Sequence, residues 1–228
     1  MKQYRIRSFT LREGRFTKAQ REAIKQLFPI YGLALDDGKL DFQQIFGRAA
    51  ETILEIGFGM GDTLVAMAEQ NPQKNFIGIE VFRPGIGSIL QQIHAKQLKN
   101  IRIIHYDAVE VLQNYIADNS LAGVQIFFPD PWPKRRHHKR RLIQVEFIKL
   151  IQQKLKSQGF LHIATDWEDY AKHVKKIFES FSGWIEKNVK SSDRPITKFE
   201  QRGKKLQHQI WDMAFVRRPN SLEPESTS

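Results

Sequence analysis

Short apolar runs alternate with amphipathic stretches along most of this chain, and this alternation restricts its fold more than any other feature. The apolar runs predict buried strands at 52–56, 76–79, 101–105, 124–128 and 160–164, with two more strands at 184–189 and 209–216. Helical periodicity predicts helices at 63–70, 84–98, 109–117, 142–156 and 169–181. Strands that alternate with helices need crossover connections. The sequence therefore predicts an α/β fold, a mostly parallel seven-stranded sheet with helices on both faces.

The chain of 228 residues has room for one such domain, which we place at residues 49–218. Before it, residues 1–48 form a basic segment that we expect to be partly flexible, with one short helix at 18–27; residues 219–228 are expected to be a disordered tail. No apolar run approaches the roughly 20 residues that cross a bilayer. The N-terminus lacks a secretory signal, and there is no cysteine. We therefore expect a cytoplasmic protein with no membrane partner.

The first predicted strand runs into a glycine-rich turn, in which Gly57, Gly59 and Gly61 alternate with larger residues. Such a turn lets the backbone approach a bound nucleotide, although similar turns also occur for packing reasons alone. A dinucleotide-binding turn carries its third glycine five residues after its first, and here that position holds Asp62. Because an aspartate repels a pyrophosphate, the turn is unfavourable for a dinucleotide.

Carboxylates lie at or just after the ends of the first four predicted strands, and they are Glu55, Glu80, Asp107 and Asp130. Parallel sheets bind ligands outside the carboxyl ends of their strands. S-adenosylmethionine suits such a ring of acids, because it has a sulfonium, an ammonium, two ribose hydroxyls and an adenine amino group. Glu80 is placed to accept both ribose hydroxyls, as an acid in an NAD site also does. Asp107 fits a helix N-cap as well as a ligand contact.

A proline-rich loop follows the fourth predicted strand, where three prolines alternate with Asp130, Trp132 and Lys134. Proline fixes φ and restricts the residue before it, so the loop is extended and stiff. We expect Asp130 and Lys134 to be presented from this frame close to the reacting end of the cofactor. A plain proline-rich linker is the alternative interpretation.

The stretch from Lys134 to Arg141 holds six Lys or Arg side chains and two histidines in eight residues. The whole chain has 36 Lys and Arg against 25 Asp and Glu, a net charge of +11. A basic run beside a catalytic loop predicts binding to the phosphates of a nucleic acid, whereas a solvated helix face or a localisation signal is the alternative. Adjacent His137 and His138 cannot easily converge on one ion, so we expect no metal.

Four segments, in matching order, resemble those of the tRNA (guanine-N7-)-methyltransferases: EIGFG at 55–59, FPDPWPK at 128–134, TDW at 165–167 and RPITKFEQRG at 194–203. The N-terminal Arg7, Ser8 and Phe9 are also similar, and the resemblance covers nearly the whole chain. It implies a Rossmann-like class I methyltransferase with S-adenosylmethionine as cofactor. It also implies a tRNA substrate that is methylated on N7 of guanosine 46 in the variable loop.

The resemblance also implies roles for single residues. The cofactor contacts it implies are Glu55, Glu80, Asp107 and Asp130, with Asp130 also as the active-site residue. From the glycine-rich turn itself we expect Gly57, Gly59 and Gly61 to contact the cofactor as well. The substrate contacts are Lys134, Asp166, Thr197, Lys198, Phe199 and Glu200. The RNA contacts are Arg136, His137, His138, Lys139, Arg140 and Arg141. Taken by itself, Phe199 favours core packing over stacking on a base, and Thr197 with Glu200 has the spacing of a capping box.

Two other classes of protein share parts of this pattern. One is an NAD-linked oxidoreductase on a similar fold, which Asp62 opposes. The other is a non-catalytic RNA-binding protein on a methyltransferase fold, which the intact acids oppose. We expect no obligatory protein partner, and a monomer or a homodimer.

Overall fold

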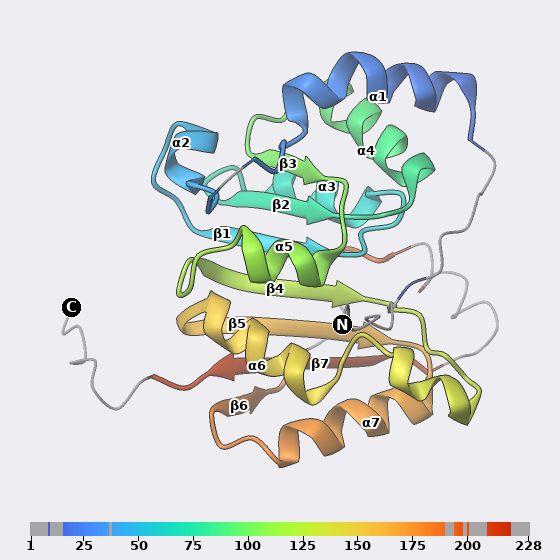
Figure 1. Ribbon diagram of the computed structural model, residues 1–228, viewed down its shortest axis with the longest axis vertical. Coiled ribbons are helices and arrows are strands. Elements are labelled where there is room, and N and C mark those ends of the chain that lie inside the picture. Colours follow the sequence, from blue (N-terminus) through green and yellow to red (C-terminus); the bar gives the residue numbers. More distant parts are fainter. Residues whose placement is uncertain are drawn as a thin grey trace, which may run out of the picture.

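Seven strands of the described chain form one sheet, in the order β3-β2-β1-β4-β5-β7-β6 (Figure 1). The computed structural model describes residues 9, 16–36, 38–189, 194–197, 200 and 209–219. The strands are β1 (Thr52–Ile56), β2 (Asn75–Ile79), β3 (Ile101–Ile104), β4 (Leu121–Phe127), β5 (Leu155–Thr165), β6 (Trp184–Lys187) and β7 (Trp211–Arg217). The first five strands in the sheet order, β3, β2, β1, β4 and β5, pair in parallel, whereas β7 is antiparallel to both β5 and β6. The predicted mostly parallel seven-stranded sheet is confirmed.

Helices cover both faces of the sheet. They are α1 (Lys18–Tyr31), α2 (Phe42–Phe46), α3 (Asp62–Gln70), α4 (Arg83–Ala95), α5 (Ala108–Asn114), α6 (Val145–Lys154) and α7 (Glu168–Glu179), with a 3₁₀ helix, η1 (Arg135–Arg140). One buried cluster joins α1, α3 and α4 to the sheet, and a second joins α5, α6 and α7 to the opposite face. None of the helices in the described ranges is both long and apolar enough to cross a membrane.

The strand order reverses its direction at the centre of the sheet. β1 pairs with both β2 and β4, although the chain passes through β2 and β3 before it returns to β4. The connections that leave the carboxyl ends of β1 and β4 therefore diverge to opposite faces. Such a point leaves a crevice at that edge of the sheet, where ligands bind in folds of this class.

The N-terminal region is more helical than predicted. α1 runs on to Tyr31, past Pro29, because a capping box of Thr17 and Gln20 starts it and because its apolar face packs beside α4. The five-residue helix α2 was not predicted, since it is too short to show a period; Asp41 caps it at the N-terminus. Most of residues 1–15 lie outside the described residues, as do residues 220–228 of the predicted tail.

Strand β5 is longer than predicted, and α6 is correspondingly shorter. The prediction placed helix at 142–156, but β5 begins at Leu155. Leu155 pairs with Leu121 of β4, and the buried side chain of Arg217 donates a hydrogen bond to the Leu155 carbonyl. These tertiary contacts override the local helical pattern at Lys156.

Gly61 is required by the packing of α3 against α4. It precedes α3 with a φ of 88°, and a Cβ placed there would lie 2.5 Å from Ile89 Cγ1. We expect Gly61→Ala to destabilise the protein by about 2–4 kcal/mol in urea unfolding, from backbone strain and overpacking together.

Gly47 provides the matched control. It has a φ of 67°, but an added Cβ would meet no atom within 4 Å. Gly47→Ala should therefore cost only the strain of the left-handed backbone, about 1–2 kcal/mol. Equal losses for the two variants would show that contact with Ile89 is not what requires glycine at position 61.

Candidate active site

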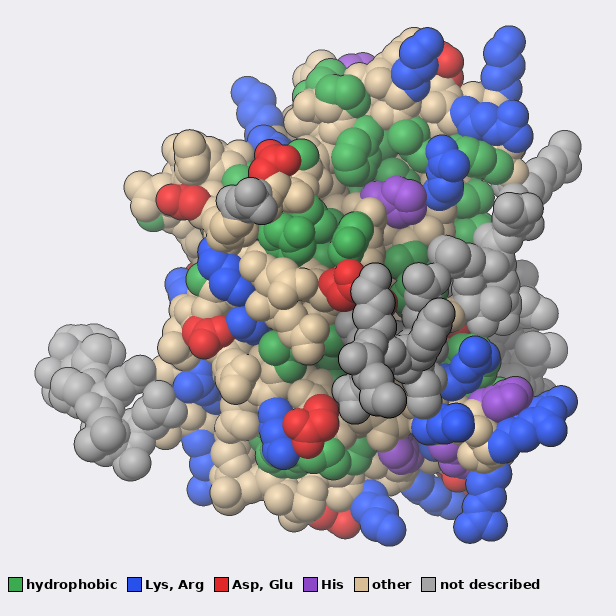
Figure 2. Space-filling model, in the orientation of Figure 1, with side chains coloured by type: hydrophobic (Ala, Val, Ile, Leu, Met, Phe, Trp, Pro, Cys, Tyr) green, Lys and Arg blue, Asp and Glu red, His purple; other side chains and the backbone are tan. Residues whose placement is uncertain are grey.

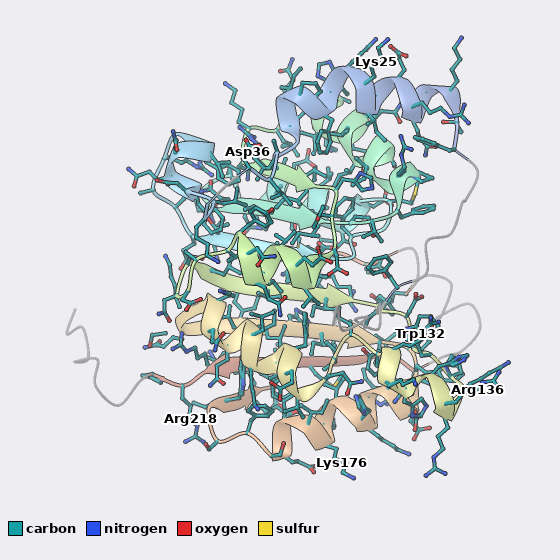
Figure 3. The ribbon with its side chains drawn as sticks, viewed as in Figure 1. Lys25, Asp36, Trp132, Arg136, Lys176 and Arg218 are labelled. Atoms are coloured by element: carbon teal, nitrogen blue, oxygen red, sulfur yellow. The ribbon has the colours of Figure 1, made fainter. Side chains whose placement is uncertain are left out.

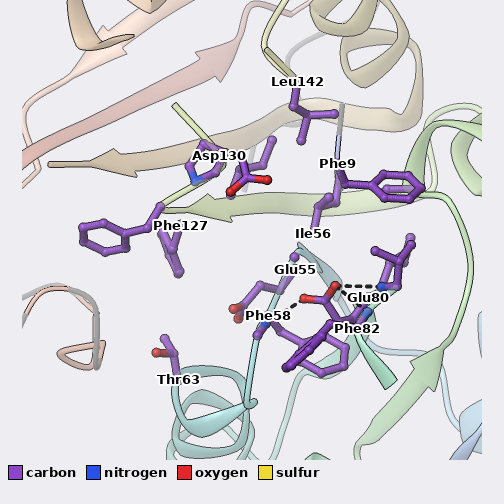
Figure 4. A pocket seen from close by; sticks show the side chains of 18 of the residues that line it. Phe9, Glu55, Ile56, Phe58, Thr63, Glu80, Phe82, Phe127, Asp130 and Leu142 are labelled. Atoms are coloured by element: carbon purple, nitrogen blue, oxygen red, sulfur yellow. Dashed lines mark hydrogen bonds between the residues drawn. The ribbon is translucent and has the colours of Figure 1, made fainter. Parts of the chain in front are cut away.

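A cavity of about 380 Å³ opens at the carboxyl edge of the sheet, where β1 to β4 end. Its lining includes the glycine turn after β1, residues Glu80 to Phe82 after β2, Tyr106 to Val109 after β3, and Phe127 to Asp130 at the end of β4 (Figure 4). The structure therefore brings together all four predicted acids. Phe9 of the N-terminal segment also lines the cavity, which the sequence did not indicate.

The glycine turn forms an open cradle at one side of this cavity. Gly57 and Gly59 have φ values of 75° and 59°, and a Cβ at either position would meet no atom within 4 Å. A ligand can therefore approach this backbone closely. Gly61 differs from them, because it is absent from the cavity lining and faces Ile89. Its glycine serves helix packing, and the cofactor contact predicted for Gly61 has no support in this geometry.

Glu80 ties the turn after β1 to the end of β2. Its Oε2 accepts the N–H of Gly59 at 2.9 Å, and its Oε1 accepts the N–H groups of Val81 at 2.7 Å and Phe82 at 3.0 Å. Burial raises the pKa of Glu80, while these backbone donors act to lower it. An ionised carboxyl group accepts roughly four hydrogen bonds, so about one position remains on Oε2. Accepting both ribose hydroxyls, as predicted, would exceed that.

Glu55 is a buried carboxyl group with one oxygen, Oε2, that has no donor among the described residues. Only 2% of the residue is exposed, and burial raises its pKa to about 8, with a further rise from Glu80 and an opposing effect from Arg194. Among the described residues, none donates a hydrogen bond to Glu55 Oε2. A buried acceptor without a donor is costly. A ligand with a cationic N–H group at this end of the cavity would supply both the donor and the missing charge.

The acids after β3 and β4 differ in their constraints. Asp107 caps α5, because its Oδ1 accepts the N–H of Val109 at 2.8 Å and that of Glu110 at 3.2 Å. It also lines the cavity, so the capping role and a ligand contact are compatible. Asp130 is exposed and projects from the loop after β4 toward the same cavity (Figure 4). It is therefore the acid nearest to a substrate that arrives from solvent.

The proline loop is held in an unusual backbone conformation. Phe128 and Trp132 have φ values of 52° and 47°, a region that residues other than glycine rarely adopt. The N–H of Phe128 donates to the Ala164 carbonyl of β5 at 2.8 Å, and Arg141 Nε donates to the Pro131 carbonyl at 3.0 Å. These bonds from the surrounding structure offset the backbone strain, which is a property that functional loops often share.

Arg141 is a buried support for the loop. Its side chain is 1% exposed, pairs with Asp169, and lies over the ring of Tyr170 at 4.9 Å. The sequence predicted an RNA contact here because Arg141 ends the basic run. In this conformation its guanidinium is covered, so the geometry assigns it to holding Pro131 and does not support a contact with RNA.

The rest of the basic run lies at the surface beside the loop. Arg135 to Arg140 form η1, and Lys134, Arg136 and Lys139 are exposed. Figure 3 shows Trp132 and Arg136 at the edge where the cavity opens, and Figure 2 shows Lys, Arg and His side chains gathered there. The Arg140 guanidinium lies 4.6 Å from the centre of the Trp132 ring. Desolvation of the His137 ring and the neighbouring cations lower the pKa of His137, which favours its neutral form.

The positions predicted to bind substrate lie around the same edge, but not all are accessible. Asp166 follows β5 and is half-buried, and Thr197 is buried and lines the cavity. Glu200 has no exposed side-chain surface and pairs with Arg194. Lys198 and Phe199 lie outside the described residues.

Sequence reasoning missed a buried polar cluster of Arg194, Asp212 and His162 behind the cavity. Arg194 belongs to a quoted motif, but nothing in its spacing indicates burial. Asp212 and His162 lie within predicted strands that otherwise look apolar. Only the pairing of β5 with β7, which sets His162 opposite Ala214 and Ala164 opposite Asp212, brings them together.

Comparison with known proteins agrees with the fold and the cavity. A family model described as "Putative methyltransferase" matches residues 49–213. The structure is similar to that of the 16S rRNA methyltransferase KamB, with a TM-score of 0.58 at 12% identity over 82% of this chain and 95% of that one. A SAM-dependent methyltransferase from Aquifex aeolicus aligns with a TM-score of 0.51 at 14% identity, over 76% and 86%. The fold is that of the class I S-adenosylmethionine-dependent methyltransferases.

Curated sequences give a finer assignment. The chain is 50% identical to the tRNA (guanine-N(7)-)-methyltransferase of Shewanella sp. (strain MR-4), over 93% of this chain and 92% of that protein. It is 51% identical to the protein of the same name from Nitrosococcus oceani, over 95% and 92%. This chain belongs to the tRNA (guanine-N7-)-methyltransferase family.

The buried charge of Glu55 predicts a trade of stability against binding. A folded-state pKa of about 8, above the ordinary 4.5, means that the folded protein holds a proton which the unfolded chain releases. Its contribution to stability is therefore lost as pH rises from 4.5 to about 8. Glu55→Gln should stabilise the ligand-free protein, by an amount that grows over that range to about 1–3 kcal/mol. Its affinity for S-adenosylmethionine should fall about ten- to hundredfold.

Thermal unfolding at pH 5 and pH 8.5, with calorimetric titration of the cofactor, measures both effects. Exposed Glu186 on the edge strand β6 offers the control, Glu186→Gln, which should change neither. A Glu55→Gln protein with the same stability difference at both pH values would contradict the raised pKa.

Proposed function

We propose that this protein transfers the methyl group of S-adenosylmethionine to N7 of a guanine in tRNA, and that the guanine is nucleotide 46 of the variable loop. The observation that carries the proposal is a cavity whose buried acid, Glu55, has an oxygen without a donor in the described part of the chain, beside an exposed cationic helix, η1. The first suits a cationic methyl donor and the second suits a polyanion. The names of the curated relatives support the same reaction.

The residues of the cavity fit the cofactor group by group. Glu55 would accept the ammonium, and the open backbone at Gly57 and Gly59 would lie against the amino-acid part. Glu80 has one position left for a ribose hydroxyl, and Asp107 remains at the cavity beside Tyr106. When bound, the cofactor supplies an electrophilic methyl group on a sulfonium. Asp130, which lines the same cavity, would lie on the side from which the substrate arrives.

Guanine N7 has a lone pair and no proton, so the reaction needs no general base. The protein then acts by alignment and by stabilising the charge that develops on the purine. Asp130 is suited to accept hydrogen bonds from guanine N1–H and the exocyclic amine, which selects guanine and balances the new positive charge. Asp166, at the end of the neighbouring strand β5, is the other acid in reach of that role.

The exposed cations of η1 and Lys134 are suited to hold the phosphates around the target nucleotide. We exclude Arg141 from this set because it is buried. A tRNA substrate also implies action in the cytoplasm. The oligomeric state stays a prediction of monomer or homodimer.

Methylation of unmodified tRNA by the purified protein, with labelled S-adenosylmethionine, tests the proposal. Chemical cleavage at N7-methylguanine should place the label at nucleotide 46. A titration with NAD in parallel tests the oxidoreductase alternative, which predicts tight NAD binding and no transfer of label. RNA binding without transfer would instead identify a non-catalytic protein.

The same assay tests Asp130. We expect Asp130→Asn to lower kcat/KM for tRNA about ten- to hundredfold, since a bidentate contact is lost. Inosine lacks the exocyclic amine, so the original protein should methylate a transcript with inosine at the target more slowly than one with guanosine. Asp130→Asn should methylate the two transcripts at the same reduced rate. If Asp166→Asn erases the preference for guanine and Asp130→Asn does not, the roles belong the other way round.

Salt dependence tests the RNA surface. With about four to six phosphates neutralised, the log–log slope of binding against salt should be about −0.7 to −0.9 per phosphate. Replacing Arg136 and Lys139 with glutamine should reduce the slope by two such steps and leave affinity for S-adenosylmethionine unchanged. Arg218 is exposed on the opposite side of the molecule and supplies the control, Arg218→Gln (Figure 3). If Arg218→Gln reduced the slope by one full step, as much per charge removed as the double variant, the cations would act without a defined binding surface.

A further inference from the structure

Arg194 is a buried cation directly behind the cavity wall. Its side chain has no exposed surface. The guanidinium lies 5.1 Å from the ring centre of Phe127 and 5.6 Å from that of Phe128, and both rings line the cavity. Its charge also acts on the carboxyl group of Glu55, whose pKa it lowers. One cation therefore contacts the two aromatic residues at the start of the proline loop and also acts electrostatically on Glu55.

Two acids fix the orientation of this guanidinium. Its Nε and Nη2 donate to the two carboxylate oxygens of Asp212 at 2.8 and 3.0 Å, and its Nη1 donates to Glu200 Oε2 at 2.6 Å. Asp212 Oδ1 also lies 2.9 Å from His162 Nε2. The His162 ring packs edge-on against Phe127, with 5.1 Å between the ring centres. A planar fork held on two sides has little freedom to turn.

The same cluster fixes Thr197 and Glu200, two of the residues that the family resemblance implies for substrate. Thr197 lines the cavity, and its Oγ1 accepts the N–H of Glu200 at 3.0 Å. The carboxylate of Glu200 is buried against Arg194. In this conformation Glu200 acts on the site through Arg194, in place of the direct substrate contact that was predicted.

A second buried arginine, on the strand β7 that also carries Asp212, shows what a purely structural role looks like. Arg217 lies at the far end of β7, where it donates to the Leu155 carbonyl and to the Asn119 side chain. Neither Arg217 nor its two partners line the cavity. Buried ion pairs add little net stability compared with apolar packing, so stability alone does not explain two acids and a histidine gathered around Arg194.

We propose that Arg194, held by Asp212 and Glu200, is a positioning residue that fixes Thr197 and the loop at Phe128 relative to Glu55 and thereby couples RNA binding to cofactor binding. This inference rests on the proposed function. Of the described charged groups, Glu80 raises the pKa of Glu55 and Arg194 lowers it. If RNA binding at the segment that carries Thr197 displaces Arg194, the electrostatic potential at Glu55 therefore changes, and with it the affinity for the cofactor. Cofactor binding should change the affinity for RNA by the same factor, because linkage is reciprocal.

Two substitutions separate the charge of Arg194 from its shape. Arg194→Gln removes the cation, so the pKa of Glu55 rises and the pH midpoint of S-adenosylmethionine affinity moves upward. Arg194→Lys keeps the charge and the midpoint, but one ammonium cannot hold both acids in a fork. We expect KM for tRNA to rise about tenfold in both variants. Calorimetric titrations from pH 6 to 9 and methylation kinetics at varied tRNA concentration measure the two effects.

Arg217→Gln is the matched control, because it also removes a buried arginine, at the end of β7 away from the cavity. It should lower thermal stability and leave both the pH midpoint and KM unchanged. The proposal is wrong if Arg194→Gln behaves in the same way as Arg217→Gln. Should Arg194→Gln fail to fold, Asp212→Asn takes its place, with a raised KM expected and an unchanged KM overturning the proposal.

Failure of the proposed function is distinguishable from failure of this inference. If the original protein binds S-adenosylmethionine but does not methylate tRNA, the function fails. The pH midpoint still reports on Arg194 in that case, because it requires no RNA.

Discussion

The carboxyl groups of Glu55 and Glu80 lie beside one another at the carboxyl edge of the sheet, and their burial shapes everything around them. Glu80 is stabilised by three backbone N–H groups, and its bond to the N–H of Gly59 holds the glycine turn. Glu55 Oε2 has no donor among the described residues, and burial and the neighbouring Glu80 raise the pKa of Glu55 to about 8. The protein thus folds around a group whose charged form is stable only when a cation arrives, which makes ligand binding and electrostatic relief the same event.

The fold keeps this acidic cavity separate from a cationic surface while placing the two in contact at one loop. β4 ends at the cavity, and the proline loop carries the chain directly to η1. Buried Arg141 and Arg194 hold this loop from two sides, by a bond to the Pro131 carbonyl and by contact with Phe128. Because the loop is stiff, the cationic side chains of η1 stay apart from the four carboxylates of the cavity and do not neutralise them. A polyanion can then bind to η1 while the acidic cavity beside it keeps its charge.

The sequence predicted what depends on local pattern and missed what depends on pairing. All seven strands and the position of the four acids followed from alternation and from the rule that parallel strands end at one edge. The helix α2, the early start of β5 and the burial of Arg141 did not, because each is decided by contacts distant in the chain. Arg141 shows this most clearly, since it has the same composition context as exposed Arg136. Its burial comes from Asp169 and Tyr170, on α7.

The place of β7 in the sheet has a consequence for how the protein is made. β7 is the last described strand, yet it lies between β5 and β6, which are both synthesised earlier. Until it inserts, β5 and β6 present unpaired edges that favour association with other chains. β7 also carries Asp212, whose carboxylate binds Arg194. The segment of Arg194 and Thr197 therefore makes this contact only after β7 has joined the sheet. The seven-stranded sheet can therefore close only after β7 has been made, and the edges of β5 and β6 stay open until then.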